Sequence, residues 1–86
     1  MIQAFSFQVS WLRHSYPIPQ VLGLNNFTNV KDPRFSALHT PGTEEYVLRI
    51  RHTRISDAGF YECQVAGAIT IYKIIKLDIV GKFSLS

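Results

Sequence analysis

The segment from residue 57 to residue 63 constrains the fold of this chain more than any other. Its sequence, D-A-G-F-Y-E-C, places a tyrosine two residues before a cysteine. This spacing is typical of the turn into an inner strand of a two-layered β-domain, where the Tyr61 ring fills the core and its hydroxyl binds the backbone upstream. Gly59 gives this turn its backbone freedom. Cys63 is the only cysteine in 86 residues, so the disulfide partner that such a strand usually has is absent from this chain.

Length and composition limit the chain to one small globular domain. Of its 86 residues, 47% are hydrophobic and 17% are charged, which is too apolar for a disordered segment. The net charge of +3 is scattered without a basic block, which argues against nucleic acid or an anionic membrane surface as a partner. No apolar run approaches the roughly 20 residues of a membrane-spanning helix. Residues 1–9 lack a basic start, so we expect neither a signal peptide nor an anchor in this chain.

Alternation of apolar and polar residues predicts an all-β fold. In residues 8–14, for example, Val9 and Trp11 fall on one face of an expected strand and Leu12 and His14 on the other. The expected strands cover residues 8–14, 20–24, 34–39, 45–51, 59–66 and 69–80. We expect a polar loop at 25–33, a connection at 52–58 and a loose tail at 81–86. Six short strands favour a β-sandwich or a small barrel, and propensity alone does not choose between them.

Further features favour a sandwich of the immunoglobulin type. Trp11 lies far upstream of Cys63, in the order expected when a buried tryptophan packs against the core sulfur. Arg34 and Asp57 are expected to form an ion pair that closes one end of the sandwich. Each feature alone fits an ordinary core or surface residue. Their order and spacing, together with Tyr61, predict an immunoglobulin-like V-type sandwich.

The motifs extend over most of the chain: V-S-W-L-R at 9–13, V-L-G at 21–23, F-T at 27–28, D-P-R-F at 32–35, H at 39, Y-V-L-R-I at 46–50 and D-A-G-F-Y-E-C-Q-V at 57–65. This series resembles the first immunoglobulin domain of the insect Dpr (defective proboscis extension response) cell-surface receptors. The resemblance implies a neuronal membrane glycoprotein whose full-length form stands on the outer face of the plasma membrane. It implies binding to DIP-like or Dpr-like immunoglobulin receptors, heterophilic or homophilic, in the specification of synaptic partners.

The chain departs from that family pattern at its beginning. The family's strands A and B, with the first cysteine, would precede Trp11 by well over a dozen residues, and only ten residues do so. Tyr46 also stands where the family usually has tryptophan. We therefore expect an all-β V-type sandwich that lacks strands A and B, with a partial domain at residues 1–80 and a tail at 81–86. Because a missing disulfide alone costs about 2–5 kcal/mol, the isolated chain is expected to be unstable or to aggregate.

Function in such a sandwich resides on a surface. The resemblance implies contacts through the sheet of strands C, C′, F and G, which correspond to the expected strands at 8–14, 20–24, 59–66 and 69–80. No cofactor or metal is expected. Alternation selects the side chains that point outward from this sheet. The expected partner-binding residues are Leu12, His14, Val21, Leu22, Glu62 and Gln64, with Ile74 and Lys76 as further candidates. A shift of one residue in the register would reverse these assignments.

The tripeptide Asn26-Phe27-Thr28 is an N-glycosylation sequence in the predicted polar loop. Such short matches are frequent by chance, and their use requires the secretory pathway. The turn setting and the extracellular resemblance favour modification of Asn26.

Two kinds of reaction centre fit the sequence less well. A nucleophilic enzyme would use Cys63 with His39 or His52 as its base, but a cysteine in this position is expected to be buried, where thiols are inert. A metal site formed by His14, His39 and His52 matches no known ligand spacing.

Two binding alternatives stay open. A small basic barrel for single-stranded nucleic acid would carry aromatic side chains on an exposed face, whereas Trp11, Phe35 and Tyr61 fall on inward positions. A generic secreted or immune-type immunoglobulin-like binding domain is the alternative within the same fold.

Overall fold

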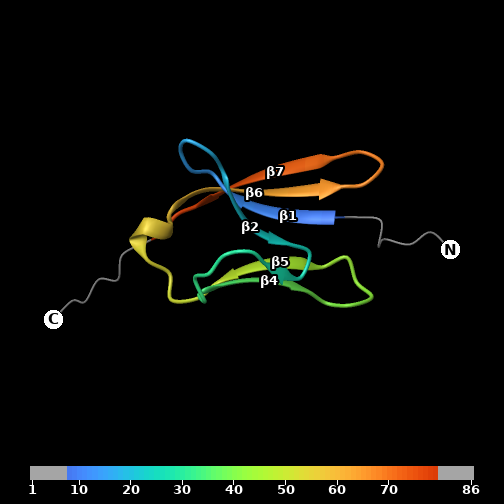
Figure 1. Ribbon diagram of the computed structural model, residues 1–86, viewed down its shortest axis with the longest axis horizontal. Coiled ribbons are helices and arrows are strands. Elements are labelled where there is room, and N and C mark those ends of the chain that lie inside the picture. The colour runs from blue at the N-terminus through green and yellow to red at the C-terminus, as the bar shows by residue number, and fades with distance from the viewer. Residues whose placement is uncertain (1–7, 80–86) are drawn as a thin grey trace.

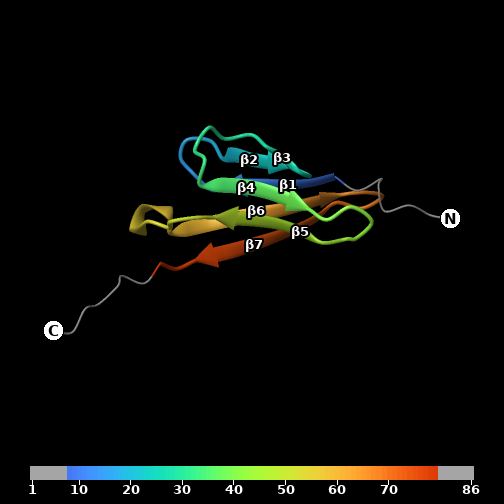
Figure 2. The same cartoon turned by 90° about the horizontal axis from the view of Figure 1, so that it is seen from below.

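Two antiparallel sheets lie face to face in the computed structural model, which describes residues 8–79 (Figures 1 and 2). The larger sheet has the strand order β3-β2-β1-β6-β7, and β4 pairs with β5 in the smaller one. The elements are β1 (Gln8–Arg13), β2 (Gln20–Leu24), β3 (Phe27–Thr28), β4 (Phe35–His39), β5 (Tyr46–Ile50), the 3-10 helix η2 (Ile55–Asp57), β6 (Gly59–Ala66) and β7 (Ile71–Leu77). Within residues 8–79, no helix is long and apolar enough to cross a membrane.

Most of the predicted strands are confirmed to within a residue or two at each end. The last strand is shorter than predicted, because β7 begins at Ile71 and ends at Leu77. The loop predicted at 25–33 is wrong in part, since Phe27 and Thr28 form a short strand that pairs with the end of β2. Asn25 makes this turn possible by adopting a left-handed φ of 53°, which asparagine tolerates better than most residues. The tail predicted at 81–86 lies outside the described residues.

The core lies between the two sheets. Its buried hydrophobic residues come from both layers and are Val9, Trp11, Leu22, Phe35, Ala37 and Tyr61. Trp11 on β1 pairs directly with Cys63 on β6, so the tryptophan and the cysteine are cross-strand neighbours as the sandwich prediction requires. On its other side Trp11 pairs with Gly23. A Cβ atom at Gly23 would lie 2.7 Å from the Cβ of Ala37, so the absence of a side chain lets β2 approach β4 closely.

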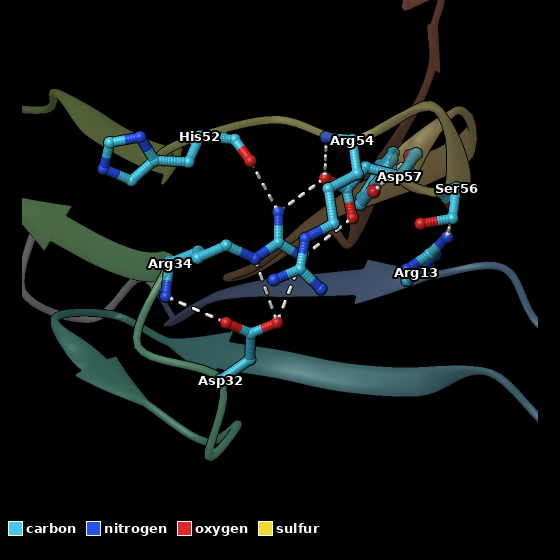
Figure 3. Close-up of polar contacts among 8 residues, drawn as sticks. Arg13, Asp32, Arg34, His52, Arg54, Ser56 and Asp57 are labelled. Carbon is cyan, nitrogen blue, oxygen red and sulfur yellow. Dashed lines mark hydrogen bonds and ion pairs between the residues drawn. The ribbon is translucent and has the colours of Figure 1, made fainter.

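A buried ion pair ties the start of β4 to η2 at one end of the sandwich (Figure 3). Nη1 of Arg34 donates to Oδ2 of Asp57 at 2.6 Å, and Nη2 donates to Oδ1 at 3.0 Å. Asp57 is only 1% exposed. The Arg34 hydrogen bonds lower the pKa of Asp57 to about 2, against the opposing effect of burial. Two parallel charge-assisted hydrogen bonds also fix the relative orientation of the two side chains.

Further hydrogen bonds hold the backbone around Asp57 in place. The Tyr61 hydroxyl donates to the carbonyl of Asp57 at 2.6 Å, which is the upstream bond that the tyrosine spacing predicts. The backbone N–H of Arg54 donates to Oδ2 of Asp57 at 2.7 Å. Arg13 on β1 donates to the carbonyl of Ser56 (Figure 3). Together these bonds join both sheets to one turn of chain.

Candidate recognition face

We define the outer face as the side of the five-stranded sheet that points away from β4 and β5. Leu12 pairs with Val21 on β2 and with Glu62 on β6, and Glu62 pairs with Ile74 on β7. Residues that pair directly across antiparallel strands point to the same side of the sheet. One row of side chains therefore crosses four strands and consists of Val21, Leu12, Glu62 and Ile74.

A second row crosses all five strands. Ser10 on β1 pairs with Leu24 on β2 and with Gln64 on β6. Leu24 then pairs with Phe27 on β3, and Gln64 with Tyr72 on β7. The outer face thus contains two continuous parallel rows, and the paired residues Phe60 and Lys76 lie on the same side, beyond Glu62 and Ile74.

The centre of the outer face is polar and held by hydrogen bonds. Nε2 of His14 lies 2.8 Å from Oε1 of Glu62. Nε2 of Gln64 donates to the other oxygen, Oε2, at 2.6 Å. These bonds, first that from Gln64 and then that from His14, lower the pKa of Glu62. The structure thus brings together three residues that were predicted as partner-binding: Glu62 and Gln64 on β6, and His14, which directly follows β1.

Apolar side chains flank this polar centre on both sides. One group comes from β2 and β3 and the other from β6 and β7, and each member is more than a third exposed: Val21, Leu24, Phe27, Phe60, Tyr72 and Ile74. Phe27 is the most exposed of them, at 65%. Soluble domains rarely leave so many neighbouring apolar side chains uncovered unless the surface binds something.

The predicted outward position of Leu22 is wrong. The register of β1 against β2 shifts between Trp11 and Leu12. Trp11 pairs with Gly23 and Leu12 pairs with Val21, so Leu22 is left over as the extra residue of a β-bulge. The bulge turns the Leu22 side chain into the core, where it is 1% exposed, whereas Val21 is 44% exposed. Leu22 therefore belongs to the core and not to the outer face.

Sequence reasoning also missed apolar members of the outer face. Phe60 precedes Glu62 by two residues, and Tyr72 precedes Ile74 by two, so alternation from the predicted residues would have found them. Leu24 does not follow by alternation from Val21, because the bulge lies between the two residues.

Asn26 is exposed in the tight turn between β2 and β3, beside the outer face. Its neighbour Phe27 is part of that face. The hydroxyl of Thr28, the third residue of the glycosylation sequence, accepts a hydrogen bond from the backbone N–H of Ala37 at 3.1 Å. A glycan on Asn26 would therefore project from the β3 edge of the sheet.

Cys63 and His39, which the enzyme alternative would use, lie in surroundings that do not activate them for catalysis. Burial raises the pKa of the Cys63 thiol, which disfavours the reactive thiolate. Nε2 of His39 lies 2.8 Å from the carbonyl of Thr43, and the His39 ring stacks on Tyr46 at 4.0 Å. Within residues 8–79 there is no cluster of three acidic, histidine or cysteine side chains that could hold a metal ion.

An apolar groove of about 290 Å³ opens between β5 and β7 on the inner side of the sandwich. Its lining consists of Trp11, Tyr46, Val47, Leu48, Ile50, Tyr61, Ile75 and Leu77. None of these side chains is a carboxylate, an imidazole, an amine or a thiol, and of the two phenols the Tyr61 hydroxyl already donates to the carbonyl of Asp57. Trp11, Phe35 and Tyr61 are all buried, and none of them provides an exposed stacking platform for bases.

Known proteins share this architecture. In the complex titled Dpr1 IG1 bound to DIP-eta IG1, the matched chain has a TM-score of 0.76 and 27% identity, over 87% of this chain and 69% of that chain. In the complex of Dpr11 IG1 with DIP-gamma IG+IG2, the matched chain has a TM-score of 0.71 and 29% identity, over 85% of this chain and 35% of that chain. In the complex of Dpr2 Ig1-Ig2 with DIP-Theta Ig1-Ig3, the matched chain has a TM-score of 0.74 and 27% identity, over 86% of this chain and 33% of that chain.

Sequence relatives agree with the structural ones. Lachesin from Drosophila melanogaster is 34% identical over 64 residues, which are 71% of this chain and 18% of Lachesin. The chain thus spans less than a fifth of that relative and about a third of two of the structures. The model of the Immunoglobulin V-set domain matches residues 4–77. With its two facing sheets and its cross-strand tryptophan and cysteine, this chain belongs to the Immunoglobulin V-set domain family.

Proposed function

We propose that this chain is a cell-surface recognition module that binds other immunoglobulin-superfamily receptors through its outer face. The observation that carries the proposal is the pair of side-chain rows across the five-stranded sheet, with a hydrogen-bonded polar centre and apolar flanks. The solved structures that it resembles are Dpr immunoglobulin domains bound to DIP partners. Dpr-like and DIP-like domains are therefore the first partners to test, and the outer side of the plasma membrane is the proposed location.

The composition of the outer face suits this role. Binding energy in protein interfaces concentrates in a few residues that become fully desolvated when the partner docks. Leu12 is partly buried in the middle of its row, and Val21 beside it is exposed. The Glu62 carboxylate is already oriented by His14 and Gln64, so it loses little freedom when a partner docks.

The proposal can be tested by measuring binding of this chain to immobilised first immunoglobulin domains of the DIP and Dpr proteins. Replacing Leu12 and Val21 together by alanine should weaken binding by about tenfold or more, since each residue of a binding centre contributes roughly 1 kcal/mol or more. Val47→Ala is a matched control, because Val47 is similarly exposed, at 40%, but lies on β5 in the other sheet. Unchanged affinity of the double variant would refute the proposed face.

Binding to none of these domains, with a partner found among unrelated immunoglobulin proteins, would favour a generic immunoglobulin-like binding domain. Binding to oligonucleotides that weakens steeply with salt would instead support the nucleic-acid alternative.

A further inference from the structure

The loop between β1 and β2 stands on the outer-face side of the five-stranded sheet. It comprises residues 14–19, because β1 ends at Arg13 and β2 begins at Gln20, and these two residues pair with each other. In Figure 1 the loop projects from the ends of both strands, away from β4 and β5. The backbone N–H of His14 donates to the carbonyl of Phe60 at 2.9 Å, which ties the base of the loop to β6. The outer face therefore has a raised border at this end.

Two apolar side chains of the loop are largely exposed. Tyr16 is 97% exposed and Ile18 is 72% exposed, and within residues 8–79 no other large hydrophobic side chain is as exposed as Tyr16. They are not isolated, because the base of the loop lies opposite Phe60, which is itself half-exposed on the outer face. The loop thus continues an apolar flank of the outer face, and apolar surface that is contiguous in this way marks a binding site.

The backbone of the loop is restricted before any partner arrives. The rings of Pro17 and Pro19 fix their own φ angles. Tyr16 and Ile18 each precede a proline, which holds a residue to extended conformations. The Ser15 hydroxyl also donates to the carbonyl of Ile18 at 2.7 Å, across the tip of the loop. Because few conformations are open to residues 16–19, the loop loses little conformational entropy on binding.

The side chain of Tyr16 is well suited to contact a partner. A tyrosine has a large apolar ring, a polar hydroxyl and only two side-chain torsions, so it contributes contact area at a low cost in entropy. Tyrosine is also one of the residues in which the energy of protein interfaces concentrates. Since Tyr16 is almost fully exposed, it adds little to the core, and its exposure is explained by contact with another molecule.

We propose that Tyr16 anchors the receptor that docks on the outer face: its ring enters an apolar pocket of that receptor, and its hydroxyl donates to an acceptor at the rim of the pocket. Ile18 packs beside it. This inference rests on the proposed function, because it places the partner on the outer face. It adds the chemistry of the partner, which offers a pocket wide enough for a phenol next to an apolar surface. A receptor without such a pocket meets the loop as an obstacle, so the loop also selects among receptors.

The anchor is tested by binding of the chain to immobilised first immunoglobulin domains of the DIP and Dpr proteins. Tyr16→Ala should weaken binding by about tenfold or more, mainly through faster dissociation. Ile18→Ala should weaken it by about threefold or more. Ile55→Ala is the matched control and should leave affinity unchanged, because Ile55 is also 72% exposed but lies on η2. Each variant should unfold at the same temperature as the wild-type chain, since all three side chains are exposed.

Two further substitutions separate the ring of Tyr16 from its hydroxyl. Tyr16→Phe keeps the ring and should lose less affinity than Tyr16→Ala. Tyr16→Ser keeps a hydroxyl without the ring and should lose as much as Tyr16→Ala. Equal losses in Tyr16→Phe and Tyr16→Ala, or wild-type affinity in Tyr16→Ser, would overturn the assignment of the ring to a pocket.

The outcome also distinguishes the anchor from the proposed function. Full affinity in Tyr16→Ala, with weaker binding in the Leu12→Ala and Val21→Ala double variant, would overturn the anchor and leave the outer face intact. The reverse pattern would support the anchor and refute the outer face. Binding to none of these domains would refute the proposed function and the anchor with it.

A measurement on the wild-type complex avoids variants altogether. Hydroxyl-radical footprinting should show less oxidation of Tyr16 when the receptor domain is bound, whereas oxidation of Ile55 should not change. Equal oxidation of Tyr16 in the free and the bound chain would overturn the proposal.

Discussion

The Arg34 guanidinium holds both oxygens of the Asp57 carboxylate, at 2.6 and 3.0 Å, and thereby joins β4 to η2 across the end of the sandwich. Asp57 in turn accepts a hydrogen bond from the backbone of Arg54, and its carbonyl accepts one from Tyr61. One aspartate thus connects the small sheet, the turn and the strand that carries the cysteine. The geometry of β6, and with it the centre of the outer face, depends on this connection.

Removing the arginine should strongly destabilise the chain. Arg34→Ala leaves a buried carboxylate without its counter-charge, and breaking such a pair from one side costs about 3–5 kcal/mol. We expect urea denaturation followed by tryptophan fluorescence to show this loss, or the absence of a folded baseline. Lys76→Ala is the control, because Lys76 and Asp78 form an exposed pair 3.8 Å apart, and such pairs contribute about 1 kcal/mol at most. A similar loss in both variants would contradict the assigned role of Arg34.

The stability of the chain should fall in acid. The folded-state pKa of Asp57 is about 2, below the ordinary value of 3.8. Well above pH 5 the carboxylate is ionised in both states and its stabilisation is complete. Between about pH 5 and pH 2 the unfolded state takes up the proton first, so the free energy of unfolding decreases, and below about pH 2 the contribution is gone. Asp32 and Glu62 act in the same direction, because hydrogen bonds also lower their pKa values.

This acid dependence can be assigned to Asp57 by comparing two variants. Asp57→Asn should flatten the decrease in the free energy of unfolding between about pH 5 and pH 2, whereas Asp78→Asn, at an exposed position, should leave it unchanged. Denaturant titrations at a series of pH values supply the measurement. An unaltered slope in Asp57→Asn would exclude Asp57 as its main source.

The bulge in β2 makes opposite predictions for two leucines that are two residues apart. Leu22→Ala should cost about 2–5 kcal/mol, because it removes a fully buried side chain from the core. Leu24→Ala should cost well under ~1 kcal/mol, since Leu24 is 39% exposed on the outer face. Chemical denaturation distinguishes the two outcomes. Equal costs would indicate that the register of β2 against β1 is different from the one described.

Asn26 should carry a glycan when the chain passes through the secretory pathway. The residue is exposed in a tight turn, and Thr28 completes the acceptor sequence. We expect enzymatic removal of N-glycans to shift the mass of the secreted protein, and Asn26→Gln to abolish the shift. Gln20→Asn serves as the control, because it introduces an asparagine at an exposed position without creating an acceptor sequence. An identical mass before and after treatment would show that the site is unused.

Alternation along the chain predicted nearly every strand, because side chains in a half-buried strand must alternate between core and solvent. The inward positions of Trp11 and Tyr61 follow from this pattern, and so does the outward position of Glu62. Leu22 could not be assigned in this way, since a bulge depends on how two strands fit against each other and leaves no mark on the alternation of one strand alone. The short strand β3 was not predicted for a similar reason, because its two residues form a strand only by pairing with β2.

The sequence by itself determined the turn into β6, since a glycine, a tyrosine and a cysteine at fixed spacing restrict the backbone locally, and alternation determined where most strands lie along the chain. The tertiary structure alone decided which apolar residues are covered and which are exposed. Exposure depends on the cross-strand register and on the distance between the sheets, and both result from packing between distant segments such as Gly23 and Ala37. For the same reason the outer face became visible only when the strands were assembled.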